Sequence, residues 1–127
     1  MRLSAHEVLA IGVDYQERLI PAIHDKESLL RNSRILFTGL DLLDVPILIS
    51  RQYPKGLGDT VPEIREVAGK ARTLDKITFS CYQPGALKEE VDASGRRTVI
   101  LSGTETHVCV LQTAIDLLAA GFRVVFV

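Results

Sequence analysis

The chain has 127 residues, in which 15 lysines and arginines are balanced by 16 aspartates and glutamates. This length supports one domain with a core large enough to fold without disulfides or structural metals. The balanced charge argues against a nucleic-acid-binding surface and favours a small-molecule ligand. No apolar run approaches the roughly 20 residues that cross a bilayer, so we expect a soluble protein without a membrane segment.

The two cysteines, Cys81 and Cys109, do not have the repeated spacing of a disulfide framework. The sequence shows no pattern of a signal peptide. We therefore predict a cytoplasmic protein in which both thiols stay reduced.

In chain order, the first predicted element is a strand over residues 7–14, "EVLAIGVD", whose continuous apolar run is typical of burial on both faces. A helix is predicted over 26–43, because Leu29, Leu36, Leu40 and Leu43 recur at helical spacing. A second buried strand, 45–50, precedes "RQYPKGLGDTVPE", a loop rich in proline and glycine and long enough to line a site.

The second half of the chain repeats this alternation. Residues 76–81, "KITFSC", predict a short strand, and residues 85–95 predict a short helix closed by Gly95. The run "RTVILSG", 97–103, predicts a third strong strand. A helix over 108–120 and a last strand over 122–127 follow, the helix having an apolar stripe of Leu111, Ala114, Ile115 and Leu118.

Strands that alternate with helices predict an open α/β domain, a Rossmann-like three-layer sandwich with a mostly parallel sheet and helices on both faces. Ligands of such sheets bind beyond the carboxyl ends of the strands, where the strand order reverses. Asp14 ends the first strand, Cys109 follows the third strong strand, and Lys76 opens the segment between them. No G-x-G-x-x-G follows the first strand, which argues against a dinucleotide site.

Cys109, in "GTETHVCV", has two interpretations. If Thr106 caps the helix, Cys109 lies in the first turn, where free N–H groups and the helix dipole favour a thiolate and can bind an oxyanion. Alternatively it is a buried core thiol, as free cysteines often are. Its place at the carboxyl end of a strand favours the functional reading. Cys81 has no helix start beside it and is interpreted as a packed thiol.

Asp14 and Lys76 also have two interpretations each. Asp14 could cap the turn after its strand, or act as a general base that takes the thiol proton and returns it to a leaving amine. Lys76 alone would be a solvated surface lysine. Beside Asp14 and Cys109, it would instead stabilise a thiolate and orient the carboxylate.

Three stretches, "VDYQERL", "DKITFSCY" and "GTETHVCVLQTAIDLLAAGFRV", together resemble the isochorismatase-like cysteine hydrolases, in order through nearly the whole chain. Each motif is weak alone, and the three in order are specific. The family's D-x-Q, K-x-x-F-S and G-x-x-T-x-x-C motifs fall on Asp14 and Gln16, on Lys76, Phe79 and Ser80, and on Gly103, Thr106 and Cys109.

The resemblance implies hydrolysis of a small amide or related acyl compound through a thioester on Cys109, with Asp14 as general base and acid and Lys76 as charge stabiliser. It also implies a cis peptide between Thr104 and Glu105, and an oxyanion hole made of the N–H groups of Glu105 and Cys109. The alternative is a catalytically silent binding or scaffold protein of the same fold. The expected substrate-binding side chains are those of Gln16, Gln52, Tyr53 and Phe79.

Metal-binding members of the family have histidines after the second strand, whereas "SRQYPKGLGDT" has none. The histidines of the chain, His6, His24 and His107, do not have the spacing of metal ligands. We therefore predict neither a metal nor another cofactor, as in the metal-free branch that includes the isochorismatase-domain proteins.

Members of this family usually continue past "FRVVFV" through another helix and strand. We therefore expect residues 1–127 to be an isochorismatase-like hydrolase domain that lacks the family's last elements. An apolar final strand without a covering helix needs burial against another surface. Together with the resemblance, this predicts a homo-oligomer.

Overall fold

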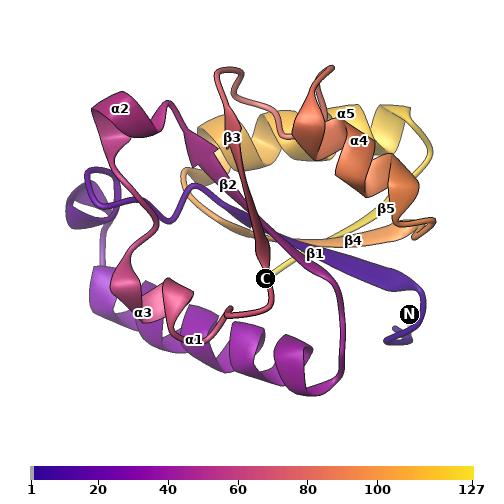
Figure 1. Ribbon diagram of the computed structural model, residues 1–127, viewed down its shortest axis with the longest axis horizontal. Coiled ribbons are helices and arrows are strands. Elements are labelled where there is room, and N and C mark those ends of the chain that lie inside the picture. Colours follow the sequence, from indigo (N-terminus) through magenta and orange to yellow (C-terminus); the bar gives the residue numbers. More distant parts are fainter. Residues whose placement is uncertain (1) are drawn as a thin grey trace.

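The computed structural model describes residues 2–127 and contains a five-stranded sheet between two layers of helices (Figure 1). The strands lie in the order β3-β2-β1-β4-β5, and every neighbouring pair is parallel. This confirms the predicted α/β class. The strands are β1 (Val8–Val13), β2 (Ile47–Gln52), β3 (Arg72–Lys76), β4 (Thr98–Gly103) and β5 (Arg123–Phe126).

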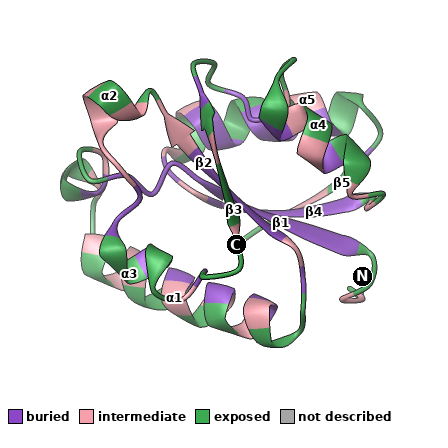
Figure 2. Cartoon of the chain, viewed as in Figure 1, coloured by how far each residue is buried: buried purple, intermediate pink, exposed green. Residues whose placement is uncertain are grey.

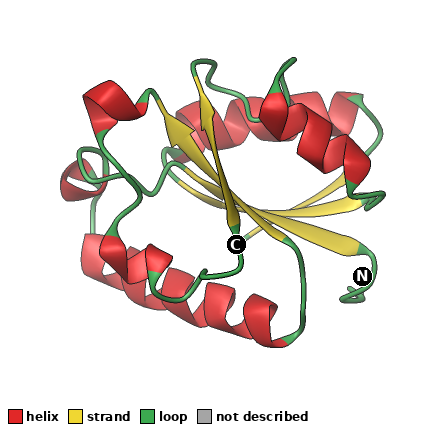
Figure 3. Cartoon of the chain, viewed as in Figure 1, coloured by secondary structure: helices red, strands yellow, loops and turns green. Residues whose placement is uncertain are grey.

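The helices cover both faces of the sheet, with α4 and α5 on one side and α1 and α3 on the other (Figure 3). Two shorter turns accompany them, a 3₁₀ turn at Ile20–Ala22 and a π-helical turn at Thr106–Val110. The helices are α1 (Lys26–Leu42), α2 (Pro54–Leu57), α3 (Pro62–Arg65), α4 (Ala86–Ala93) and α5 (Leu111–Ala119). No helix within residues 2–127 has the length and apolarity needed to span a membrane.

The central strands are buried on both faces, which explains their continuous apolar sequence (Figure 2). In β1, Leu9 and Ile11 pack in the cluster that contains α4 and α5 residues, whereas Val8 and Ala10 pack in the cluster that contains α1 residues. Burial of each large apolar side chain contributes about 1.5–3 kcal/mol.

The strand order reverses between β1 and β4, because the chain moves from β1 outward to β2 and β3 and then returns to β4 beside β1. The two carboxyl ends meet there, with Val13 paired to Gly103. This is the position at which open α/β sheets bind their ligands.

The predicted strand over residues 76–81 is wrong. The strand is β3, which ends at Lys76 after pairing with β2 from Arg72 onward. Most of this edge strand is exposed, so it lacks the apolar signature of the inner strands. Ile77 and Phe79, which suggested a strand by their alternation, lie in the loop after it and are 86% and 59% exposed.

The predicted apolar stripe of α5 is correct for Ala114 alone, although the helix exists. Leu111, Ile115 and Leu118 are exposed, while Thr113, Ala114 and Leu117 face the core. Because this helix is apolar on several faces, its period alone does not identify the buried face.

The remaining predicted elements are present with shifted bounds. In α1 the buried residues are Ser33, Phe37 and Leu40, whereas Leu43 lies beyond the helix and is exposed. The loop after β2 contains the short helices α2 and α3. Gly95 follows α4 with a φ of 66°, in agreement with the predicted helix end.

Candidate active site

Asp14 lies immediately after β1 and is completely buried. Its φ of 51° is in the left-handed region, which aspartate tolerates better than most residues. Tyr15 then enters the core, where its hydroxyl contacts the hydroxyls of Ser33 and Ser102 at 2.9 and 3.0 Å. The sharp turn therefore holds a carboxylate at the end of the central strand.

Lys76 reaches this carboxylate from the end of β3. Its Nζ lies 2.9 Å from Asp14 Oδ2, and its side chain is 4% exposed. The ammonium also donates to Gln52 Oε1 and to the carbonyls of Thr78 and Phe79, at 2.8, 3.0 and 2.8 Å. Lys76 is therefore a buried, paired cation and not a solvated surface lysine.

Ser50, on β2 between the strands that carry Asp14 and Lys76, completes the surroundings of the carboxylate. Its hydroxyl donates to Asp14 Oδ1 at 2.7 Å and accepts from Asp14 N at 3.2 Å. Sequence reasoning missed this residue, and its place at the carboxyl end of a buried strand was the available signal.

Cys109 lies in the π-helical turn that precedes α5 and is 6% exposed. The carbonyl of Glu105 accepts from Val108 N and Val110 N, at 3.1 and 3.2 Å, and so begins the turn. Thr106 is already inside the turn, so its predicted role as the cap is wrong. Turns of this type are frequent at functional sites.

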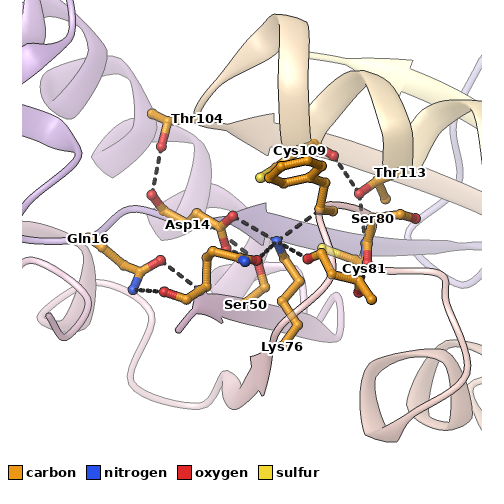
Figure 4. A network of polar contacts seen from close by, with 12 residues as sticks. Asp14, Gln16, Ser50, Lys76, Ser80, Cys81, Thr104, Cys109 and Thr113 are labelled. Atoms are coloured by element: carbon orange, nitrogen blue, oxygen red, sulfur yellow. Dashed lines mark hydrogen bonds and ion pairs between the residues drawn. The ribbon is translucent and has the colours of Figure 1, made fainter. Parts of the chain in front are cut away.

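The loop between β4 and this turn is tied to the Asp14 turn. Gly103 has a φ of 132° and packs directly against β1. Thr104 N donates to Val13 O at 2.8 Å, and Thr104 Oγ1 donates to Asp14 O at 2.6 Å. The peptide between Thr104 and Glu105 is cis, as the resemblance implied. These contacts bring Asp14 and Cys109 together, and Figure 4 shows both side chains beside Lys76.

Burial raises the pKa of the Cys109 thiol to about 12, and the Asp14 carboxylate adds to this shift while Lys76 opposes it. At neutral pH the side chain is therefore a protonated thiol. The shift is opposite to the one expected from the helix start, because burial and the carboxylate outweigh the ammonium. A buried carboxylate beside a protonated thiol can act as its base.

Residues 8–127 match the model of the Isochorismatase domain family. The chain belongs to the isochorismatase family. Isochorismatase domain-containing protein 1 of Salmo salar is 43% identical over 111 residues, which are 87% of this chain and 39% of that protein. The secreted isochorismatase effector Isc1 of Phytophthora sojae is 34% identical over 127 residues, covering 97% of this chain and 60% of that protein. The chain thus spans about half the length of such relatives.

Solved structures of other proteins have the same fold. MAR1 ribonuclease of Caenorhabditis elegans matches with a TM-score of 0.90 and 36% identity, over 100% of this chain and 65% of that chain. YcaC of Escherichia coli, an octameric hydrolase of unknown specificity, matches with a TM-score of 0.90 and 23% identity, over 100% of this chain and 64% of its own. At 23% identity, the match with YcaC shows a common fold and nothing more.

Of the residues expected to bind substrate, Gln16 is fully buried, and its side-chain amide is hydrogen-bonded to backbone atoms. Its Nε2 donates to the carbonyls of Gln52 and Gly58, both at 2.9 Å, and its Oε1 accepts from Gln52 N at 2.7 Å. Gln16 therefore ties the end of β2 to the Asp14 turn. Gln52 in turn contacts Lys76 through its side-chain oxygen.

A cavity of about 470 Å³ opens beside Lys76, between the loop after β2 and the start of α4. Tyr53, 55% exposed, borders it, but Phe79, Asp14 and Cys109 do not. Phe79 contributes its carbonyl to Lys76 while most of its side chain is exposed. The structure thus brings the three predicted catalytic residues together, and of these three Lys76 alone borders the cavity.

Cys81 is 1% exposed, which confirms its interpretation as a packed thiol. Its N–H donates to Thr113 Oγ1 at 2.9 Å, and Thr113 Oγ1 donates to the carbonyl of Cys109 at 2.7 Å. Thr113 therefore joins the segments that carry the two cysteines. Burial raises the pKa of the Cys81 thiol.

Within residues 2–127, no group of three or more His, Cys, Asp or Glu side chains is arranged to hold a metal ion. The charged group of the site is the Lys76–Asp14 pair. The absence of a metal and the cytoplasmic location stay predictions, and one relative in this family is a secreted protein.

Proposed function

We propose that this domain hydrolyses the C–N bond of a small amide, or a related acyl bond, through a thioester on Cys109. The observation that carries the proposal is the buried Lys76–Asp14 pair beside a thiol whose pKa the same carboxylate raises. An acid–base pair with a nucleophile in one buried place is the arrangement that covalent acyl transfer needs.

In the first half of the reaction, Cys109 Sγ attacks the carbonyl carbon while its proton moves to the Asp14 carboxylate. A C–S bond forms, and one electron pair of the C=O bond moves to the oxygen. When the tetrahedral intermediate collapses, the C–N bond breaks and Asp14 returns the proton to the leaving nitrogen. The amine departs and the acyl group stays on sulfur as a thioester.

In the second half, Asp14 takes a proton from a water molecule that attacks the thioester carbon. Collapse of the second intermediate breaks the C–S bond, and sulfur recovers the proton from Asp14. The product is a carboxylic acid. Lys76 stabilises the negative charge that passes between carboxylate and sulfur, because its ammonium lies 2.9 Å from Asp14 Oδ2 and lowers the pKa of Cys109.

The oxyanion of both intermediates would be bound by the N–H groups of Glu105 and Cys109. Within residues 2–127, the Glu105 N–H makes no backbone hydrogen bond. Cys109 lies in the first turn of a helix, where N–H groups point toward the helix start. Two donors directed at one oxygen would stabilise charge that develops only during the reaction.

The test is a panel of small amides scored by ammonia release. For any amide that responds, Cys109→Ala should lower kcat at least about 10³-fold, because the covalent route is lost. Cys81→Ala is the matched control and should keep most of the activity. Exhaustive chelation should leave turnover unchanged, because the proposed route uses no metal.

Retention of turnover by Cys109→Ala would contradict the thioester route, and restoration of chelated enzyme by zinc or iron would contradict the metal-free route. An unresponsive panel together with tight binding of one panel member would favour the alternative, a catalytically silent binding or scaffold protein.

Alkylation by iodoacetamide near neutral pH provides a test that needs no substrate. Cys109 should react faster than Cys81, because Asp14 can accept its proton and because Cys81 is the more deeply buried thiol. Lys76→Ala should slow the reaction, since the ammonium lowers the pKa of Cys109. Peptide mass mapping identifies the modified residue, and earlier modification of Cys81 would refute Cys109 as the nucleophile.

Self-association is also part of the proposal. Apolar side chains are exposed along α5 and at the end of β5, and a second copy could cover them. The octameric state of YcaC is consistent with this but belongs to that protein. The exposed residues are Leu111, Ile115, Leu118, Phe126 and Val127.

A further inference from the structure

The three proposed catalytic side chains do not by themselves explain how the Asp14 carboxylate is oriented. Lys76 contacts Oδ2, and a carboxylate held by one contact can still rotate about its side-chain bonds. The second oxygen, Oδ1, accepts a hydrogen bond from Ser50 at 2.7 Å. Between them, Lys76 and Ser50 hold both oxygens.

The direction of the Ser50 hydrogen bond is determined by its surroundings. The N–H of Asp14 can only donate, and it lies 3.2 Å from Ser50 Oγ, so the hydroxyl oxygen accepts there. The single hydroxyl proton is directed at Asp14 Oδ1, because an oxygen of a charged carboxylate can only accept, and Cys81 is a further hydrogen-bonding neighbour of the hydroxyl. Ser50 is completely buried, as is Asp14, so neither is exposed to bulk water that could replace this donor.

The position of Ser50 follows from the topology. Strand β2 lies between β1 and β3, and Ser50 is paired with Val13, the last residue before Asp14. Gln52, two residues later on the same face of β2, contacts Lys76. Strand β2 thus supplies one hydrogen-bonding side chain to each member of the ion pair, Ser50 to Asp14 and Gln52 to Lys76.

We propose that Ser50 is a positioning residue that keeps the Asp14 carboxylate ionised and directed at Cys109. This inference rests on the proposed function. A hydrogen bond donated to a carboxylate favours its charged form, and the charged form is the one that accepts the thiol proton. The hydroxyl acts through Asp14 and does not itself contact the reacting atoms.

The proposal predicts a change in pH dependence. The titratable groups that interact with Asp14 are Lys76 from β3, Cys109 from the turn before α5 and Cys81 from the loop before α4. Loss of the Ser50 donor removes a contact that favours the charged carboxylate. The acid limb of Cys109 reactivity, which is the low-pH range in which the alkylation rate falls, therefore moves toward neutral pH.

The experiment is the rate of Cys109 alkylation by iodoacetamide as a function of pH, in the full chain. In Ser50→Ala the acid limb should move up by about one pH unit. Ser50→Thr, which restores a hydroxyl, should return it toward the wild-type position. Ser50→Cys, with a weaker donor of similar shape, should move it part of the way and provides a second variant if Ser50→Ala does not fold.

Ser102→Ala is the matched control. Ser102 is also buried near the carboxyl end of a central strand, but its hydroxyl contacts Tyr15 and not Asp14. This variant loses a buried hydrogen bond of similar kind, so it should lose stability without moving the acid limb.

Asp14→Asn separates failure of this inference from failure of the proposed function. It should remove the acid limb and leave a single thiol titration, because the base is gone. If Asp14→Asn changes the profile while Ser50→Ala and Ser50→Cys do not, the positioning role of Ser50 is refuted. If Asp14→Asn leaves the profile unchanged, the proposed acid–base function is refuted.

Discussion

Replacing Lys76 by methionine should lower the free energy of unfolding by about 3–5 kcal/mol near neutral pH, as removal of one partner from a buried ion pair usually does. The reason is that the Asp14 carboxylate, completely buried, would lose its cation. Denaturant titration measures the change. Methionine keeps the length of the side chain, so lost packing contributes little.

Two further measurements identify the cause. Adding Asp14→Asn to Lys76→Met should recover a large part of the loss, because no charge is then left buried. Lys70→Met, which disrupts only the exposed pair with Asp44, should leave the midpoint nearly unchanged. A double variant that is no more stable than Lys76→Met would contradict this explanation.

Replacing Gly103 by alanine should destabilise the domain by about 3 kcal/mol or more and disrupt the site with it. A Cβ at this position would lie 2.1 Å from Val13 O and 2.6 Å from Val13 N, and a φ of 132° is unfavourable for any side chain. Since both obstructing atoms belong to the backbone of β1, no side-chain movement relieves the clash. The loop that carries Thr104 would have to separate from the Asp14 turn.

Thermal unfolding, followed together with Cys109 alkylation, checks this expectation. Gly39→Ala is the control, because a Cβ at Gly39 meets nothing within 4 Å and alanine favours the helix in which it lies. It should raise the midpoint slightly. Equal midpoints of thermal unfolding for Gly103→Ala and the wild type would contradict the prediction, because they would show that the ends of β1 and β4 move apart at little cost in free energy.

The sequence was sufficient to predict the parts of the fold that depend on strong local patterns. The apolar runs around β1 and β4 are buried on both faces, and a run of this kind has few other uses in a short chain. The edge strand β3 and the buried face of α5 were predicted wrongly. An exposed edge strand has no apolar signature, and a helix that is apolar on several faces does not show which of them is buried.

Candidate residues for chemistry were found for a similar reason. Asp14, Lys76 and Cys109 follow strands or precede a helix, and the ends of parallel strands meet at one edge of the sheet. Ser50 and Thr104 were not found, because a serine or threonine near a strand end is common and its partner is distant in the chain. Gln16 was assigned to the pocket, whereas its amide is occupied by the backbone of Gln52 and Gly58.

The sequence by itself determined that this protein is a parallel α/β domain with a carboxylate, a lysine and a cysteine at the ends of its strands, because short-range periodicity and motif order carry that information. Only the tertiary structure decided how those groups behave. The protonated state of Cys109 depends on burial and on a carboxylate 95 positions earlier in the numbering, and the orientation of that carboxylate depends on Ser50 of the neighbouring strand. Such effects arise from distances across the sheet, which no local pattern encodes.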